Sequence, residues 1–329
     1  MRRRTDLETR VRAARRRRAE RLAAQQSGVI SRVQLYAIGV TRHEVRANIV
    51  ARRWQRFGQQ SVVVHTGPLG DDERAWGAVF EAGPRAFLDG ASALKASGLE
   101  KFEVDKVRVS VPRGARIRRV RGIDVRQTRR WDDDDRAPGS GVPRSRPEVA
   151  AVRGALWARS DRQAALLVTM AVQQGLCTAE ALALEMLRIK RDRRRRFLHA
   201  VVLDLLGGAR SLGEIDVALE CRRRGLPEPS RQVVRRGPNG TYYLDVAWEE
   251  WGVVLEIDGI HHSWAQNVVQ DALRHNDVTL QRDLVLRLPL LGLRVAADDF
   301  FDQVERALRS RGWQGPDVMR SAGQDRRTV

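Results

Sequence analysis

The stretch of residues 242–262, which reads YYLDVAWEEWGVVLEIDGIHH, constrains the fold of this chain more than any other. Residues 242–248 and 252–257 are rich in β-branched and aromatic side chains, and the polar pair Glu249-Glu250 lies between them. This pattern is typical of two strands joined by a tight turn. We therefore expect a hairpin of buried strands here.

Both predicted strands carry acidic residues in apolar surroundings. Asp245 lies between Leu244 and Val246, while Glu256 and Asp258 follow an apolar run. Ionised carboxylates are costly in such surroundings unless a cation binds them. Positions 256 and 258 share one face of a strand, and a neighbouring strand can bring Asp245 beside them. Oxygen ligands of this kind favour Mg²⁺ or Mn²⁺ over zinc.

These residues resemble a known family. Asp245, the run Glu256-Ile257-Asp258-Gly259 and His262 are similar to the core of the restriction-endonuclease-like superfamily, whose pattern is Asp, a gap, then Glu-x-Lys. They resemble more closely a domain-of-unknown-function branch related to the very-short-patch-repair endonucleases, with Asp, then Glu-x-Asp-Gly, then His. The resemblance extends to Asp271, Arg274 and the run LVLRLP at residues 284–289.

The resemblance implies metal-dependent hydrolysis of phosphodiester bonds, with DNA as the expected substrate. Asp245 and Glu256 would hold Mg²⁺ or Mn²⁺, which lowers the pKa of a bound water. Asp258 stands where the superfamily has a lysine that helps to activate water or to stabilise developing charge. That task falls to His262, to a metal-bound water, or to nothing.

Three further residues are candidates through the same resemblance. Asp271 and Arg274 would support the site or reach substrate phosphate. The family places a helix before its strands, often with an acid that reaches the metal. Glu214 is that candidate, in the segment 211–214 that opens a helix expected at residues 215–224. Glu214 also completes a capping box with Ser211, and both explanations stay open.

The main site residues have structural explanations as well. Asp245 and Glu256 could be strand-end carboxylates paired with arginines. Asp258 could cap the turn at Gly259, and His262 could be a hydrogen-bonded loop residue instead of a general base. The sequence leaves these alternatives open.

The charge of the chain favours a polyanionic partner. Its 329 residues carry 60 basic and 41 acidic side chains, for a net charge of +19, although nearly all the basic residues are arginines and a codon bias could produce much of this excess. Residues 1–60 hold 16 Arg and 4 acids, a net of +12, whereas residues 241–329 hold 10 Arg and 14 acids, a net of −4. Basic residues in the N-terminal part and carboxylates in the C-terminal part suit a protein that binds a phosphate backbone with one part and a metal with the other.

The N-terminal pattern predicts a small helical DNA-binding domain. Residues 1–21 form a basic arm, either on DNA or as a solvated helix. Ser31 is a plausible N-cap for a helix over residues 32–38, Gly39 breaks it, and Thr41 caps a helix that ends at residue 51. The β-rich residues 61–65 supply a wing.

This region, residues 22–66, resembles the N-terminal winged helix of AbiEi-type antitoxins through GVISRVQLYAIGVTRHEVR and ARRWQRFGQQSVVV. In that arrangement the helix capped by Thr41, which is the third helix of the motif, faces DNA, and the turn after it holds phosphates. The expected DNA-binding residues are Arg42, His43, Arg46, Asn48, Arg52, Arg53 and Arg56. The alternative is a packing or partner-docking domain whose arginines form its solvated face.

The remaining sequence completes a multidomain α/β protein. We expect an α+β extension at 67–130, a linker at 131–147 rich in Pro and Gly, a helical connector at 148–204, and a restriction-endonuclease-like domain at 205–313 with a central mixed sheet flanked by helices. Residues 314–329 are expected to be disordered. The carboxylates of residues 132–135 are expected to be solvated.

Two other function classes stay open. One is a non-catalytic DNA-binding regulator or antitoxin with a nuclease-like scaffold, and the other is a module that binds a protein partner in a toxin–antitoxin or phage-defence system. Cys177 and Cys221 have no metal-like spacing and fit a reducing compartment. Without an apolar run long enough for a membrane helix, we expect a cytoplasmic protein. RNA as the nucleic acid also stays open.

Overall fold

The computed structural model describes residues 2–117, 120–128, 131–206, 209–237, 240–258 and 284–315. For residues 2–8, 209–215, 231–237, 240–245 and 258 it describes the backbone alone. The chain divides into two compact units: unit 1 is Met1–Arg159 with Gln174–Asp192, and unit 2 is Ser160–Gln173 with Arg193–Val329. The expected connector at 148–204 is therefore shared between the units. The candidate residues Asp271 and Arg274 lie outside the described residues, as does most of the expected tail at 314–329.

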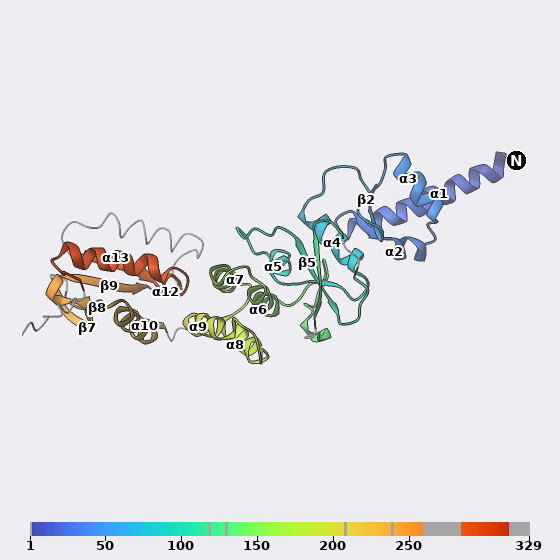
Figure 1. The fold of residues 1–329 in the computed structure, drawn as a ribbon. Helices are drawn as coiled ribbons and strands as arrows, with labels where there is room; N and C mark the ends of the chain where they lie inside the picture. Colours follow the sequence, from blue (N-terminus) through green and yellow to red (C-terminus); the bar gives the residue numbers. More distant parts are fainter. Residues whose placement is uncertain are drawn as a thin grey trace, which may run out of the picture. The chain divides into compact units, whose positions relative to one another are not determined.

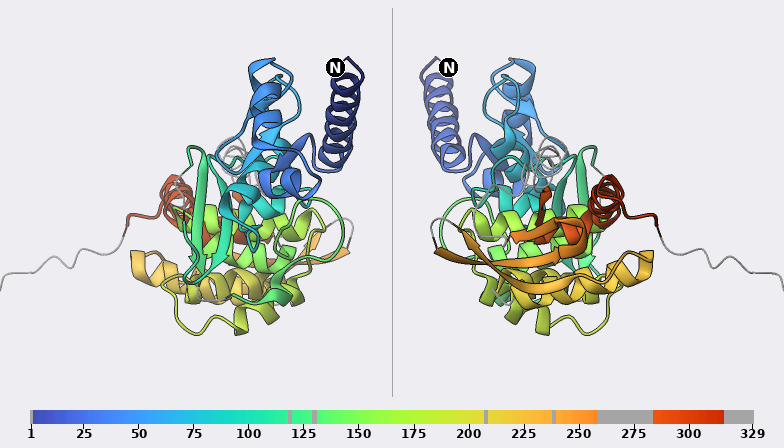
Figure 2. Two further views of the ribbon diagram at one scale, coloured as in Figure 1. Left: turned by 90° about the vertical axis from the view of Figure 1, so that its right-hand side faces the viewer. Right: turned by 90° about the vertical axis from the view of Figure 1, so that its left-hand side faces the viewer.

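The N-terminal part of unit 1 has helices next to a small antiparallel sheet. In chain order its elements are α1 (Arg2–Ala24), β1 (Val29–Ser31), α2 (Arg32–Ala37), α3 (Arg42–Val50), β2 (Gln55–Arg56) and β3 (Ser61–Val63). The strands are ordered β1-β3-β2, with both neighbours of β3 antiparallel to it. Figures 1 and 2 show α1 as a long helix at the edge of this group.

Local signals explain why the two short helices form. Ser31 and Gln34 make a reciprocal capping box on α2, and Thr41 and Glu44 make one on α3. Gly39 between the helices has φ 82°, a left-handed conformation that favours glycine. The predicted helices and the break between them are confirmed.

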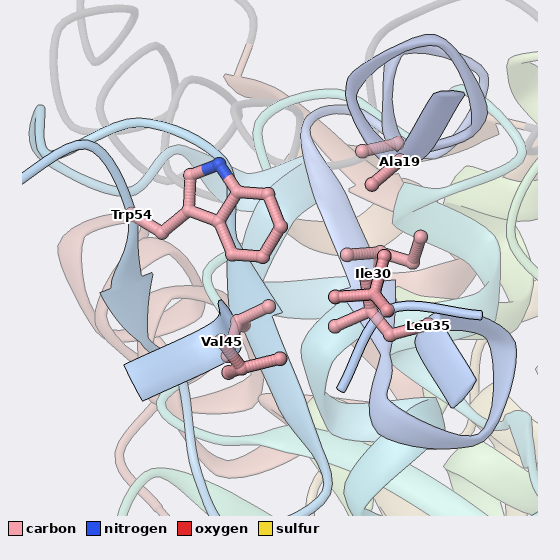
Figure 3. Packing of buried hydrophobic residues seen from close by; sticks show 8 residues of the cluster. Ala19, Ile30, Leu35, Val45 and Trp54 are labelled. Atoms are coloured by element: carbon pink, nitrogen blue, oxygen red, sulfur yellow. The ribbon is translucent and has the colours of Figure 1, made fainter. Parts of the chain in front are cut away.

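A compact apolar core holds these elements together. Figure 3 shows Ala19 of α1, Ile30 of β1, Leu35 of α2, Val45 of α3 and Trp54 packed around one centre. All five side chains are buried. Because each residue comes from a different segment, the core fixes α1 and α3 on the same small sheet.

The rest of unit 1 is built on a second small sheet. Its elements are α4 (Asp71–Ala82), β4 (Phe87–Leu88), α5 (Ala91–Lys95), β5 (Val107–Pro112), β6 (Ile123–Thr128), the 3₁₀ turn η1 (Asp133–Asp135), α6 (Pro147–Leu156) and α8 (Ala179–Leu187). The strand order is β4-β5-β6, with β4 antiparallel and β6 parallel to β5.

Asp132, Asp133 and Asp134 are exposed, as expected, but a buried ionic network corrects the expectation for Asp135. Asp135 is fully buried and pairs with the guanidinium of Arg153, which is 2% exposed. Arg153 also lies 3.2 Å from Asp89, and Arg188 reaches Asp135 at 2.8 Å. The expected linker is thus an ordered part of unit 1, bridged to β4 at Leu88. Because the cations Arg153 and Arg188 are distant from Asp135 in the sequence, local sequence patterns cannot predict that Asp135 is buried in an ionic network.

Unit 2 is a four-stranded mixed sheet with helices. Its described elements are α7 (Asp161–Gln173), α9 (Arg195–Leu205), α10 (Ala209–Arg224), β7 (Ser230–Gly237), β8 (Gly240–Trp248), the 3₁₀ turn η2 (Glu249–Trp251), β9 (Val253–Asp258), β10 (Leu284–Pro289), α12 (Leu290–Val295) and α13 (Ala297–Ser310). The order is β10-β9-β8-β7, in which β7, β8 and β9 are antiparallel neighbours and β10 is parallel to β9. The predicted hairpin is confirmed, and the run LVLRLP at residues 284–289 forms the strand β10.

Both faces of this sheet carry apolar side chains. Paired positions Val246, Leu255 and Leu286 are buried on one face. On that side the Trp248 indole donates to the Pro227 carbonyl at 2.8 Å, just beyond α10. On the alternate positions Ala247, Val254 and Val285 form a small apolar cluster. The right-hand view of Figure 2 shows the strands, in orange, side by side.

Helices α10 and α13 are joined by ion pairs. Arg224 at the end of α10 lies 2.8 Å from Asp302 and also pairs with Asp298. Its guanidinium lies over the ring of Phe301, 5.6 Å from the ring centre.

The described part of the chain is a mixed α/β protein with three small sheets. Among the described residues, none of the helices combines the length and apolar character needed to cross a membrane.

Candidate nucleic-acid interface and carboxylate site

Helix α3 and the turn after it display most of the residues expected to bind DNA. The exposed members of this set are Arg42, His43, Arg46, Arg52, Arg53 and Arg56. The capping box at Thr41 fixes the first turn of α3. The third helix therefore presents cationic side chains outward along its length and just beyond its end, which suits contact with a polyanion.

Asn48 is placed differently from the expectation that it faces DNA. It is only 7% exposed, because position 48 falls one turn after Val45 on the side of α3 that meets the core. Its Nδ2 donates to the Glu44 carbonyl at 2.9 Å, and its Oδ1 accepts from Arg53 Nε at 2.8 Å. Its carbonyl accepts from the backbone N–H groups of Arg53 and Trp54. Asn48 thus closes the end of α3 and orients Arg53.

A pocket of about 500 Å³ opens between α1 and α3. Its lining combines basic side chains from both helices with apolar residues of the core; the residues are Thr9, Arg12, Ala13, Arg15, Arg16, Val40, Thr41, His43, Glu44, Ala47, Asn48, Arg53 and Trp54. Four arginines and one glutamate give this lining a net positive charge. The sequence predicted a basic arm at residues 1–21 and, separately, a DNA-binding helix after Thr41. Only the fold brings side chains of α1 and α3 together in one pocket.

Ion pairs and hydrogen bonds hold the charged groups around α2 and α3 in place. Partial burial opposes ionisation of Glu44, but hydrogen bonds from Thr41 and the charge of Arg15, 3.4 Å away, outweigh it and lower the pKa of this carboxyl. Burial similarly opposes ionisation of Tyr36, while hydrogen bonds with Arg32 and Arg42 lower the pKa of its hydroxyl. Tyr36 was missed by sequence reasoning, because an isolated tyrosine on a helix has no distinctive local signal.

The strand register brings two predicted site residues to adjacent strands. Val246 of β8 pairs with Leu255 of β9, so Asp245 and Glu256 are the next residues beyond this pair. Glu256 is also the direct partner of Arg287 on β10. Arg287 Nε lies 3.5 Å from Glu256 Oε2, and both side chains are partly exposed.

Arg287 is a residue that sequence reasoning did not single out as part of the site. A usable signal existed, because a lone arginine interrupts the apolar run 284–289. Since parallel strands pair residue by residue, this arginine comes beside the glutamate of β9. It supplies a cation on the strand next to the one that ends at Asp258.

The other predicted site residues are only partly described. Asp258 ends β9 and pairs with Pro289, and Glu214 lies on α10; for Asp245, Asp258 and Glu214 the backbone alone is described. The predicted residues His262, Asp271 and Arg274 lie outside the described residues. Within the part of the chain that the structure describes, His, Cys, Asp and Glu residues form no group of three or more able to hold a metal ion.

The donor chemistry of the sheet nevertheless fits the expected metal. Carboxylate oxygens at positions 245, 256 and 258 are the ligands that Mg²⁺ and Mn²⁺ prefer, and the register brings two of these positions to neighbouring strands.

No protein-family model matches the chain, and no curated protein matches it. The functional argument therefore rests on the chemistry and geometry of these two sites.

Proposed function

We propose that this protein binds DNA through α3 and that its C-terminal sheet hydrolyses phosphodiester bonds with the help of a divalent metal. The element order α1, β1, α2, α3, β2, β3 with strand order β1-β3-β2 supports this proposal, because a winged helix-turn-helix would have this order with α3 as its recognition helix. The observation that carries the DNA-binding proposal is the outward row of exposed basic residues on α3 and the turn after it.

The basic residues divide into two groups by position. Arg42, His43 and Arg46 lie on α3 and would enter a groove, whereas Arg52 and Arg56 lie beyond the helix and would contact phosphates. Phosphate contacts release counterions, so binding must weaken steeply as salt rises. Asn48 acts indirectly, because its amide positions Arg53.

Fluorescence anisotropy of labelled duplexes tests DNA binding. The experiment compares wild type with Arg42→Gln/Arg46→Gln on random-sequence DNA and RNA duplexes over a range of salt concentrations. The matched control is Arg113→Gln/Arg121→Gln, which removes the same charge from exposed positions elsewhere in unit 1. We expect the α3 variant alone to lose affinity, because the control removes the same charge away from the proposed interface. Equal losses in both variants would leave α3 with no special role.

The nuclease proposal is supported by the sheet. A hairpin with a third antiparallel strand, followed by a parallel strand β10, is compatible with a restriction-endonuclease-like core. Asp245, Glu256 and Asp258 would hold Mg²⁺ or Mn²⁺, which when bound lowers the pKa of a water and neutralises charge on the attacked phosphate. Arg287 would stabilise negative charge on the phosphate, and since guanidinium stays protonated it cannot act as the base. His262 is the candidate to take the proton of the attacking water.

A non-catalytic regulator or antitoxin is the second candidate. Two observations favour it: Asp258 replaces the superfamily's lysine, and Glu256 already has a cationic partner in Arg287. In that case the sheet serves as a scaffold, and DNA binding by α3 is the whole activity.

Plasmid cleavage separates the two candidates. Supercoiled, linear and mismatched DNA are incubated with Mg²⁺, Mn²⁺ or EDTA and either wild type, Asp245→Asn or Glu256→Gln. Glu250→Gln is the control, because Glu250 is an exposed acid in the turn of the same hairpin. Metal-dependent nicking that both site variants lose and the control keeps supports the nuclease. Folded protein that binds DNA without cutting it supports the regulator.

A further inference from the structure

The indole N–H of Trp54 is a buried donor without a partner at the pocket between α1 and α3. Trp54 is 1% exposed, and its Nε1 has no hydrogen-bond acceptor among the residues that the structure describes. Buried polar groups are normally hydrogen-bonded, and an unsatisfied one is destabilising. The buried indole of Trp248 follows the rule, since it donates to the Pro227 carbonyl.

The orientation of Trp54 directs this donor away from the core. In Figure 3 its ring lies against Val45, and the nitrogen is on the ring edge that points away from that residue. Trp54 is also one of the residues that line the pocket. Trp54 therefore packs in the core and also lines the pocket, an arrangement that suits a buried tryptophan whose N–H donates to a ligand.

The charge of the pocket indicates what kind of acceptor is missing. Arg12, Arg15 and Arg16 line it from α1, and Arg53 lines it from the end of α3. Glu44, the acid among the described lining residues, is already occupied: Oε2 accepts from the Thr41 N–H at 2.6 Å, and Oε1 faces Arg15. A net positive pocket with an unused N–H donor favours an anion that is a strong hydrogen-bond acceptor.

The pocket can adapt to such a ligand. The side chains of Arg15 and Arg16 are 39% and 37% exposed, so they can change rotamer and open a path to Trp54. Its volume of about 500 Å³ lies in the range of small-molecule sites. This exceeds the need of one phosphate group and leaves room for an attached sugar.

We propose that the pocket between α1 and α3 binds a phosphate group, with the Trp54 N–H donating to one phosphate oxygen and arginines of α1 and Arg53 neutralising its charge. The phosphate belongs either to the backbone of DNA bound at α3 or to a free nucleotide. Only the first source rests on the proposed DNA binding. If DNA is the source, α1 and α3 hold the backbone from two sides.

Nuclear magnetic resonance of ¹⁵N-labelled indole groups tests the donor directly. The Trp54 Nε1–H signal is assigned by its disappearance in Trp54→Phe and then followed in wild type. The probes are inorganic phosphate, adenosine monophosphate and a short DNA duplex, each compared with sodium chloride at equal ionic strength. We expect a saturable downfield shift of this signal with at least one phosphate probe. A Trp54 signal that none of the three probes moves would overturn the proposal.

A matched pair of α1 variants separates the pocket from general electrostatics. Arg12→Gln/Arg16→Gln removes two lining charges, and Arg17→Gln/Arg18→Gln removes two charges from exposed positions outside the lining. We expect the pocket variant to weaken the Trp54 response about tenfold and the control to leave it unchanged, because charge-assisted contacts require direct approach. An equally weakened Trp54 response in both variants would overturn the proposal that phosphate binds in the pocket.

The same variants identify the source of the phosphate. If it is a DNA phosphate, the duplex saturates the Trp54 shift at the lowest concentration and the pocket variant has a salt dependence lower by about one. If it is a nucleotide, adenosine monophosphate saturates the shift first. A Trp54 response to phosphate in a protein that does not bind DNA supports the pocket and refutes the proposed function. DNA binding by a protein whose Trp54 signal no probe moves supports the proposed function and overturns the pocket proposal.

Discussion

Arg287 Nε lies 3.5 Å from Glu256 Oε2, at directly paired positions of the parallel strands β10 and β9. The side chains are 54% and 39% exposed, so solvent screens much of their attraction. A pair of this kind contributes little to stability. Its interest lies in its position, because it places a cation beside the carboxylate of Glu256 near the end of β9.

The first prediction concerns Arg287. If the sheet is a nuclease, Arg287→Gln should slow single-turnover DNA cleavage by about 10²-fold, because the transition state loses a charged donor. Arg287→Lys should recover part of the rate. The melting temperature should hardly change, since an exposed pair contributes about 0–1 kcal/mol. Cleavage at the wild-type rate by Arg287→Gln would remove this residue from the mechanism.

The second prediction concerns the buried network of unit 1. Asp135→Asn leaves Arg153 with a reduced counter-charge in an environment where it is 2% exposed. Breaking a buried ion pair from one side typically costs about 3–5 kcal/mol. Urea unfolding should show a loss of that order. Asp133→Asn, two residues away and exposed, is the control and should stay near wild type; similar losses in both would contradict the network.

The third prediction separates structure from DNA contact on α3. Asn48→Ala removes both hydrogen bonds of a buried amide and should destabilise the protein by about 1–3 kcal/mol. Arg46→Ala changes an exposed residue and should alter stability by less than about 0.5 kcal/mol. Anisotropy should show the opposite order, with the larger direct loss of DNA affinity in Arg46→Ala. Chemical unfolding and binding curves of the two variants, measured side by side, decide this.

The fourth prediction is a pH dependence in unit 2. Burial raises the pKa of Asp204, and the ion pair with Arg294, whose Nε lies 3.0 Å away, opposes this rise. The folded state therefore holds this proton more tightly than the unfolded chain does. The resulting stabilisation is complete below the unfolded pKa and is lost as pH rises through the folded pKa.

Asp204→Asn should abolish the pH-dependent stabilisation that comes from the raised pKa of Asp204. The unfolding free energy of wild type should fall relative to the variant as pH increases above the ordinary aspartate pKa of 3.8, by about 1.4 kcal/mol for each unit of pKa difference between the states. Asp299→Asn, an exposed acid of α13, serves as the control. Parallel pH profiles for wild type and Asp204→Asn would refute the assignment.

The fifth prediction uses the two cysteines, one in each unit. Burial raises the pKa of both Cys177 and Cys221 to about 12, so few thiolates form near neutral pH. Alkylation should be slow in the native protein and should follow unfolding of unit 1 at Cys177 and of unit 2 at Cys221. Mass spectrometry of peptides after timed labelling in urea measures each site. Rapid labelling of Cys221 without denaturant would contradict its burial.

Several elements were predictable because their signals are local. The capping residues Ser31 and Thr41 mark the starts of α2 and α3, and Gly39 marks the break between them. The alternating and apolar runs around Asp245 and Glu256 predicted the hairpin β8–β9. In each case a few consecutive residues contain the physical cause, which is a cap, a left-handed turn or a period of two.

Other features depend on residues that are distant in sequence. The role of Asp135 follows from Arg153 and Arg188, and the burial of Asn48 follows from the packing of α3 on Trp54. The same applies to the division into two units, which cuts through the expected connector. Local patterns contain no information on which cation or apolar surface will meet a given side chain.

The sequence by itself determined the short helices, the strands and the types of residue available for chemistry, because caps, turns and hydrophobic periodicity act over a few residues. Only the tertiary structure decided that Arg287 stands beside Glu256 and that α1 and α3 share one basic pocket at Trp54. The reason is physical: strand register and helix packing are set by the burial of apolar surface across the whole unit, and charged side chains take their partners from that arrangement.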